Sequence, residues 1–284
     1  MTKEGMRRSI DRFIIKEREA EKSKNTVHHY AHVLDLLYDF LPEGELNKTG
    51  IIEFKEHLLE SGFEPSTVQN YITIVNKWLK YAKMKRYTVT NIKVQGKASL
   101  EEEELLTPED FMRLLRQAKR TGRKQYCMIM EIMGYTGIRL SELQYFTVEN
   151  IQKPKLLVHN KGKIRTIIMP TSLKKKIKKY IEEQGIESGY IFPGKKEGTM
   201  LHPTTVYKNI RKIAAAAKIK KTKAHPHAFR HLFAVRYIEE GGQPSDLADI
   251  LGHSQLETTA IYTRTTDKMK KIQVEKINYR NRRK

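Results

Sequence analysis

Residues 226–263 read PHAFRHLFAVRYIEEGGQPSDLADILGHSQLETTAIYT, and this stretch decides how the second half of the chain is interpreted. It contains a His-x-x-Arg at His227 and Arg230, a Leu-Gly-His-Ser that includes His253, and Tyr262 nine residues further on. The pattern predicts a helix that begins at the first proline, so His227 and Arg230 share one helix face. Reactive polar side chains are therefore concentrated in a short part of the sequence.

Two further motifs lie upstream of this stretch. Residues 136–143 read TGIRLSEL and carry Arg139 and Glu142, and Lys161 lies in an Asn-Lys-Gly-Lys turn between two short β-like runs. Cutting a phosphodiester without a metal requires charge stabilisation on the non-bridging oxygens, which the planar arginine fork supplies. It also requires a nucleophile, a proton acceptor and an acid for the leaving oxygen. The chain holds all of these groups, so no metal and no cofactor is expected.

These motifs, in this order and with these gaps, resemble those of the tyrosine recombinase family, also called the phage-integrase family. The resemblance covers nearly the whole chain and is strong over residues 105–265. It implies a minimal two-domain protein of the Xer-like or transposon-encoded type. Phe229 stands where the family often has Leu, and Leu232 stands where it often has Thr or Ser.

The resemblance implies a role for each reacting group. Tyr262 would attack the scissile phosphate and form a 3′-phosphotyrosyl intermediate. Arg139 and Arg230 would clamp the non-bridging oxygens. Lys161 would protonate the departing 5′ hydroxyl, and strands would be exchanged through a Holliday junction without ATP.

The resemblance also implies the surroundings of these groups. His227 would act as general base or proton relay, and His253 would hydrogen-bond the phosphate. Glu142 and His231 would support the active site.

Two other basic residues lie close to Lys161 in the sequence. Lys163 and Arg165 lie on the same predicted hairpin as Lys161. Alternate strand residues face opposite sides of a strand, so we expect Lys163 and Arg165 to point elsewhere.

Charge supports a polyanionic partner. The 284 residues include 54 Lys and Arg against 33 Asp and Glu, a net charge of +21 with a pI near 9.8. Nucleic acid explains this excess better than a membrane surface, because no basic helix has a strongly apolar opposite face. Cys127 is the only cysteine, which excludes an internal disulfide and a cysteine zinc site. The first residues lack an apolar signal and no run reaches membrane-spanning length, so the expected location is the cytoplasm.

The expected fold is mainly α. Residues 1–95 are expected to form a DNA-binding bundle of amphipathic helices, and residues 96–106 a polar linker. Thr107 and Pro108 predict a helix start, and Gly137 predicts a helix end. Residues 107–284 predict a mixed α/β catalytic domain with a small antiparallel sheet and a tail helix over 267–279. The run 190–192 is a candidate third strand.

The expected partners are a duplex DNA recombination site, a homotetramer in synapse on DNA and, without a stated identity, an accessory DNA-bound protein. Two rivals remain: a type IB topoisomerase-like enzyme, which uses the same chemistry alone, and a DNA-binding protein with a decayed active site. The biological role, in integration and excision or in cointegrate and dimer resolution, stays open. The candidate phosphate contacts are basic residues on two predicted helix faces: Lys77, Lys80, Lys83, Lys208, Arg211 and Lys212.

Overall fold

The computed structural model describes residues 2–42, 46–92, 105–160 and 163–252. Within these ranges the protein is mainly helical, with one two-stranded antiparallel sheet, which confirms the predicted fold class. The chain forms two compact units, residues 1–98 and residues 99–284. No helix in the described ranges is long and apolar enough to cross a membrane.

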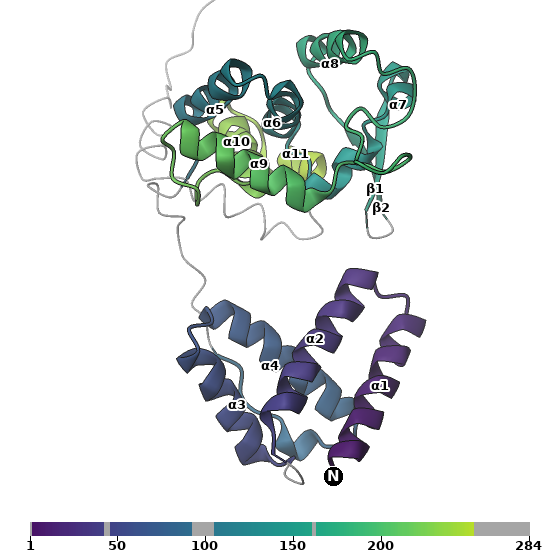
Figure 1. Ribbon diagram of the computed structural model, residues 1–284, viewed down its shortest axis with the longest axis vertical. Helices are drawn as coiled ribbons and strands as arrows, with labels where there is room; N and C mark the ends of the chain where they lie inside the picture. Colours follow the sequence, from purple (N-terminus) through teal and green to yellow (C-terminus); the bar gives the residue numbers. More distant parts are fainter. Residues whose placement is uncertain (1, 43–45, 93–104, 161–162, 253–284) are drawn as a thin grey trace, which may run out of the picture. The chain divides into compact units, whose positions relative to one another are not determined.

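The first unit is a helical bundle built on amphipathic helices (Figure 1). Ser23 and Asn47 cap two of its helices by accepting a hydrogen bond from a backbone N–H of the first turn. The core is formed by the apolar faces that the sequence predicts, with Trp78 fully buried at its centre. The elements are α1 (Lys3–Glu19), α2 (Lys24–Phe40), α3 (Lys48–Glu60), α4 (Pro65–Tyr81) and the 3₁₀ helix η1 (Lys85–Tyr87).

One expected DNA contact in this unit has an internal partner instead. The Lys77 ammonium is hydrogen-bonded to the carboxylate of Glu17, which is buried, and also lies 4.8 Å from the centre of the Tyr30 ring. A buried carboxylate needs such a partner. Lys77 therefore has a structural role in the bundle, and its side chain is still 40% exposed, so DNA contact by Lys77 stays a prediction. Lys80 and Lys83 are exposed.

The second unit packs helices around a separate apolar core (Figure 1). Its first helix begins as the sequence predicts, because Thr107 Oγ1 accepts a hydrogen bond from Asp110 N at 3.1 Å and a proline follows the cap. The elements are α5 (Pro108–Arg120), α6 (Lys124–Thr136), the 3₁₀ helix η3 (Leu140–Tyr145), α7 (Val148–Gln152), β1 (Leu156–Asn160), β2 (Lys163–Ile167), α8 (Thr171–Glu183), α9 (Pro203–Ala216), α10 (Pro226–Glu239) and α11 (Pro244–Leu251).

The hairpin register determines which residues share a face of the sheet. Leu156 pairs with Ile167 and Val158 with Arg165, and these four residues lie on the side that faces the core. The candidate third strand is wrong, because Tyr190 forms only an isolated bridge with Thr147 in the described part of the chain.

Candidate active site

Arg139 is positioned by the sharp end of α6. Gly137 ends this helix in the left-handed region, with φ 63°. A Cβ there would lie 2.5 Å from Phe233 Cδ1 and 2.7 Å from Leu251 Cδ2, so both backbone conformation and space require glycine. The chain then turns into η3, and Arg139 occupies the N-cap position of that helix.

Glu142 closes the same turn. Its Oε2 accepts a hydrogen bond from Arg139 N at 2.8 Å, and its Oε1 accepts one from Arg139 Nη1 at 3.3 Å. The Glu142 residue is only 1% exposed. The buried carboxylate therefore fixes both the backbone and the guanidinium of Arg139, as its expected supporting role requires.

Arg165 joins this pair from strand β2. Its Nη2 donates to Glu142 Oε2 at 2.6 Å, and its Nη1 donates to Ile250 O at 2.5 Å. The expectation that Arg165 points away from the site is therefore wrong. Its pKa is lowered chiefly by burial, with Arg139 adding to the effect and Glu142 opposing it.

Arg230 reaches the same place from α10. It is 1% exposed, and its Nη1 and Nη2 donate to Gly137 O and Leu251 O, each at 2.7 Å. A buried guanidinium needs such acceptors because its charge is desolvated.

The three arginines share one helix end. Arg165, Arg230 and Arg139 donate in turn to the carbonyls of Ile250, Leu251 and Gly252, the last bond being 3.2 Å long. The final carbonyls of a helix lack helical partners and form its negative end, so cations are favoured there. We call Arg139, Arg165 and Arg230 the arginine cluster.

Two members of the arginine cluster share one carboxylate. Among the described residues, Glu142 is ion-paired with both Arg139 and Arg165. The Arg139 side chain is 32% exposed, against 13% for Arg165. Arg139 is therefore the accessible member, and its guanidinium can bind an anion such as a phosphodiester.

His227 lies beside the cluster on α10. Burial lowers its pKa below the ordinary value of 6.5, and the charge of Arg230 lowers it further. The rings of His227 and His231 are 4.5 Å apart and nearly perpendicular, at 86°. A neutral imidazole at pH 7 is the form that accepts a proton.

The structure thus brings together Arg139, Glu142, His227 and Arg230, with His231 against His227. The remaining expected site residues lie outside the described residues. These are Lys161, His253 and Tyr262.

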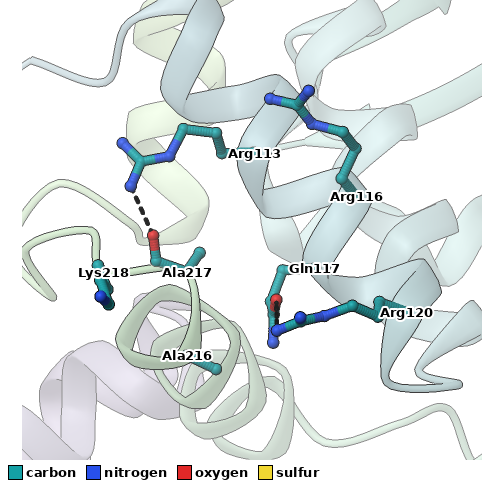
Figure 2. A pocket seen from close by; sticks show the side chains of 7 residues that line it. All are labelled: Arg113, Arg116, Gln117, Arg120, Ala216, Ala217 and Lys218. Carbon is teal, nitrogen blue, oxygen red and sulfur yellow. Dashed lines mark hydrogen bonds between the residues drawn. The ribbon is translucent and has the colours of Figure 1, made fainter.

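Two other basic surfaces lie in the second unit. On α9 the expected DNA contacts Lys208, Arg211 and Lys212 are all exposed. A groove of about 270 Å³ between α5 and the end of α9 is lined mainly by Arg113, Arg116, Arg120 and Lys218 (Figure 2).

One arginine of that groove is bonded within the unit. Arg113 donates to Ala217 O at 2.7 Å (Figure 2). It also donates to Asp110 Oδ1 at 3.2 Å. Arg113 therefore closes the end of α9 with the same kind of bonds that the arginine cluster makes at the end of α11.

Comparison with known proteins identifies the family of the chain. The phage integrase family model matches residues 104–269, and the phage integrase SAM-like domain model matches residues 10–97. The tyrosine recombinase XerA of Pyrococcus furiosus is 30% identical over 90% of this chain and 89% of its own length. The tyrosine recombinase XerD of Staphylococcus aureus is 25% identical over 85% of this chain and 88% of its own length.

Solved structures show the same fold. The XerH site-specific recombinase bound to its difH substrate has a TM-score of 0.70 and 20% identity, and the match covers 96% of this chain and 84% of that one. The Tn1549 transposon integrase in complex with circular intermediate DNA has a TM-score of 0.75 and 17% identity, and the match covers 98% of this chain and 100% of that one.

The fold and the family matches define an enzyme of the DNA-recombining class. The chain belongs to the phage integrase family and is a tyrosine site-specific recombinase.

Proposed function

We propose that this protein cleaves and rejoins DNA at a specific duplex site, with Tyr262 as nucleophile and with Arg139 and Arg230 holding the scissile phosphate. The observation that carries this is the arginine cluster, whose three guanidiniums are held by carbonyls at the end of α11, with Arg139 as its exposed member. That helix end immediately precedes His253, and Tyr262 follows nine residues later.

The chemistry is a balanced transfer between oxygens. The Tyr262 phenol oxygen attacks phosphorus as its proton passes to the neutral His227, and the bond from phosphorus to the 5′ oxygen breaks. Lys161 donates the proton that the leaving oxygen needs, and His253 donates a hydrogen bond to the phosphate. Attack by a 5′ hydroxyl from another strand reverses these steps, so neither ATP nor a metal is consumed.

Binding and assembly complete the proposal. Exposed lysines and arginines on α4 and α9 contact DNA phosphates, among them Lys80, Lys208 and Arg211. Exchange takes place between two sites held by a homotetramer in the cytoplasm. It serves integration and excision, or resolution, of a mobile element or replicon.

The tail is proposed to link protomers. A cavity of about 650 Å³ between α5, α6 and α10 is lined by apolar side chains that include Met112, Tyr135 and Phe233. Its position beside α10 makes it a suitable acceptor for the apolar side chains of residues 267–279 from a neighbour. Deleting those residues should spare binding to one site and abolish synapsis.

Covalent capture tests the nucleophile and identifies the target sequence in the same experiment. The protein is mixed with sheared genomic DNA of the organism that encodes it, denatured in detergent, and DNA that stays attached is sequenced. We expect a single enriched sequence, and none with the Tyr262→Phe variant, which keeps the ring but lacks the attacking oxygen. Attachment by this variant would refute the assignment, whereas relaxation of plasmids that lack the captured sequence would favour a topoisomerase.

A further inference from the structure

We propose that Arg165 is a positioning residue for strand cleavage: it shares Glu142 with Arg139, and it ties the β1–β2 hairpin to the end of α11. The proposal rests on the proposed function and adds a residue to it. Arg165 does not need to touch DNA in this role, because it acts through Glu142 and through the backbone of Ile250.

The contacts show that Arg165 has a fixed place. Its side chain is 13% exposed, and its two terminal nitrogens are bonded to two different elements, η3 and α11. Gly252 leaves room for it, since a Cβ at that position would lie 2.7 Å from Arg165 Cδ. A buried guanidinium that two elements hold and a glycine accommodates is a specific arrangement and not a solvated strand residue.

The shared carboxylate gives this arrangement an electrostatic consequence. Glu142 Oε2 accepts from both Arg139 N and Arg165 Nη2, while Oε1 accepts from Arg139 Nη1. With Arg165 present, one negative charge is divided between two guanidiniums. Without Arg165 the whole charge would face Arg139, and the arginine that is open to the phosphate would be largely neutralised.

The second consequence is geometric. Arg165 lies on the strand that follows Lys161, and its bonded partner Ile250 lies three residues before His253. A single planar fork therefore fixes β2 against α11. The same bonds set the spacing between the chain segments that lead to the proposed acid and to the proposed nucleophile.

Arg113 offers a matched control. Like Arg165, it donates to a carboxylate, that of Asp110, and to a carbonyl at a helix end. That carbonyl is Ala217 O at the end of α9 (Figure 2). Arg113→Ala therefore removes the same kind of bonds from the same unit without touching the arginine cluster.

The test is single-turnover cleavage of the duplex recovered by covalent capture. Arg165→Ala should reduce the cleavage rate by about 10²-fold, the effect of a small misplacement of reacting groups. Binding of that duplex should change by less than about threefold, because the variant still binds the flanking phosphates. Arg113→Ala should cleave within about threefold of the unmodified protein, since its bonds lie outside the site.

A neutral substrate separates positioning from simple loss of structure. When a methylphosphonate replaces the scissile phosphate, one charged non-bridging oxygen is absent and the charge of Arg139 matters less. The deficit of Arg165→Ala should then shrink to less than about tenfold, because the lost stabilisation was electrostatic. A structural defect would give the same deficit on both substrates and would overturn the proposal.

Hydrogen exchange tests the tie itself. Arg165→Ala should speed exchange of the backbone amides near the end of α11, and Arg113→Ala should do so at the end of α9 instead. Normal cleavage by Arg165→Ala, alongside normal cleavage by the unmodified protein, would refute the role of Arg165 alone. Failure of the unmodified protein to form any adduct would instead refute the proposed function.

Discussion

Gly137→Ala is expected to destabilise the second unit and to disturb the arginine cluster together. The alanine backbone would have to adopt a φ of 63°, and its Cβ would lie 2.5 Å from Phe233 Cδ1 and 2.7 Å from Leu251 Cδ2. A left-handed backbone costs about 1–2 kcal/mol for a residue with a side chain. Overpacking of the core adds about 1–3 kcal/mol.

The expected total is about 2–5 kcal/mol of unfolding free energy, from backbone strain and overpacking together. For a unit of this size each kcal/mol lowers Tm by roughly 2–4 °C, so the shift should be roughly 4–20 °C. Thermal unfolding followed by circular dichroism measures it. Cleavage should fall by more than the loss of stability explains, because Gly137 O and Leu251 O are both acceptors of hydrogen bonds from Arg230.

Gly122→Ala is the control for this measurement. Gly122 has nearly the same backbone conformation, φ 67°, but a Cβ there would meet no atom within 4 Å. It should show only the strain of about 1–2 kcal/mol and normal cleavage. If both variants melt at the same temperature, the close packing of Gly137 does not contribute to stability and the reasoning is wrong.

Three further predictions concern charge and proton transfer. Burial and Arg230 lower the pKa of His227 below 6.5, so it stays neutral at pH 7 and cleavage should fall only as the pH drops below 6.5. A single-turnover pH profile with a midpoint at or above 6.5 would contradict this. Lys161→Ala should cleave ordinary DNA about 10²–10⁴-fold more slowly. Its cleavage should recover on a substrate with sulfur at the bridging 5′ position, because a thiolate leaves without a proton. If Lys163→Ala is rescued instead, the general acid is Lys163. Lys77→Ala should lower the free energy of unfolding by about 1–3 kcal/mol in chemical denaturation, because Glu17 loses its partner, and should leave DNA affinity unchanged. Lys80→Ala should weaken DNA binding without changing stability. The reverse pattern would show that Lys77 is the DNA contact.

Local chemistry explains why the helices could be predicted. The Thr107–Pro108 start of α5 and the Gly137 end of α6 depend on residues next to one another, and both appear in the structure where the sequence places them. The paired positions of Arg139 and Glu142 likewise follow from a spacing of three residues within one turn.

Contacts between distant residues explain what could not be predicted. Strand β2 has isoleucines at 164 and 167, on both faces, so apolar alternation does not reveal that Arg165 faces the core. Its partner Ile250 is 85 residues away in the sequence. Glu17, the partner of Lys77, is 60 residues away, which is why Lys77 resembles a surface lysine when its own helix is considered alone.

The register of the hairpin also bears on whether Lys161 or Lys163 is the general acid. Position 163 pairs with position 160, and it has the same parity as Arg165 and Ile167. Parity therefore does not exclude Lys163 as the acid, contrary to the expectation from the sequence, and the bridging-sulfur comparison is needed to choose between them.

The bonds at the end of α11 have a thermodynamic consequence for ligand binding. A free arginine side chain loses about 2 kcal/mol of rotamer entropy when it is immobilised. Arg139, Arg165 and Arg230 are already immobilised by the carbonyls of three consecutive residues before any phosphate arrives. Arg139, the exposed member, has five N–H donors, so donors remain on it for a phosphate after its described bonds are made. An incoming phosphate therefore meets preorganised donors, and little of its binding energy is lost to ordering them.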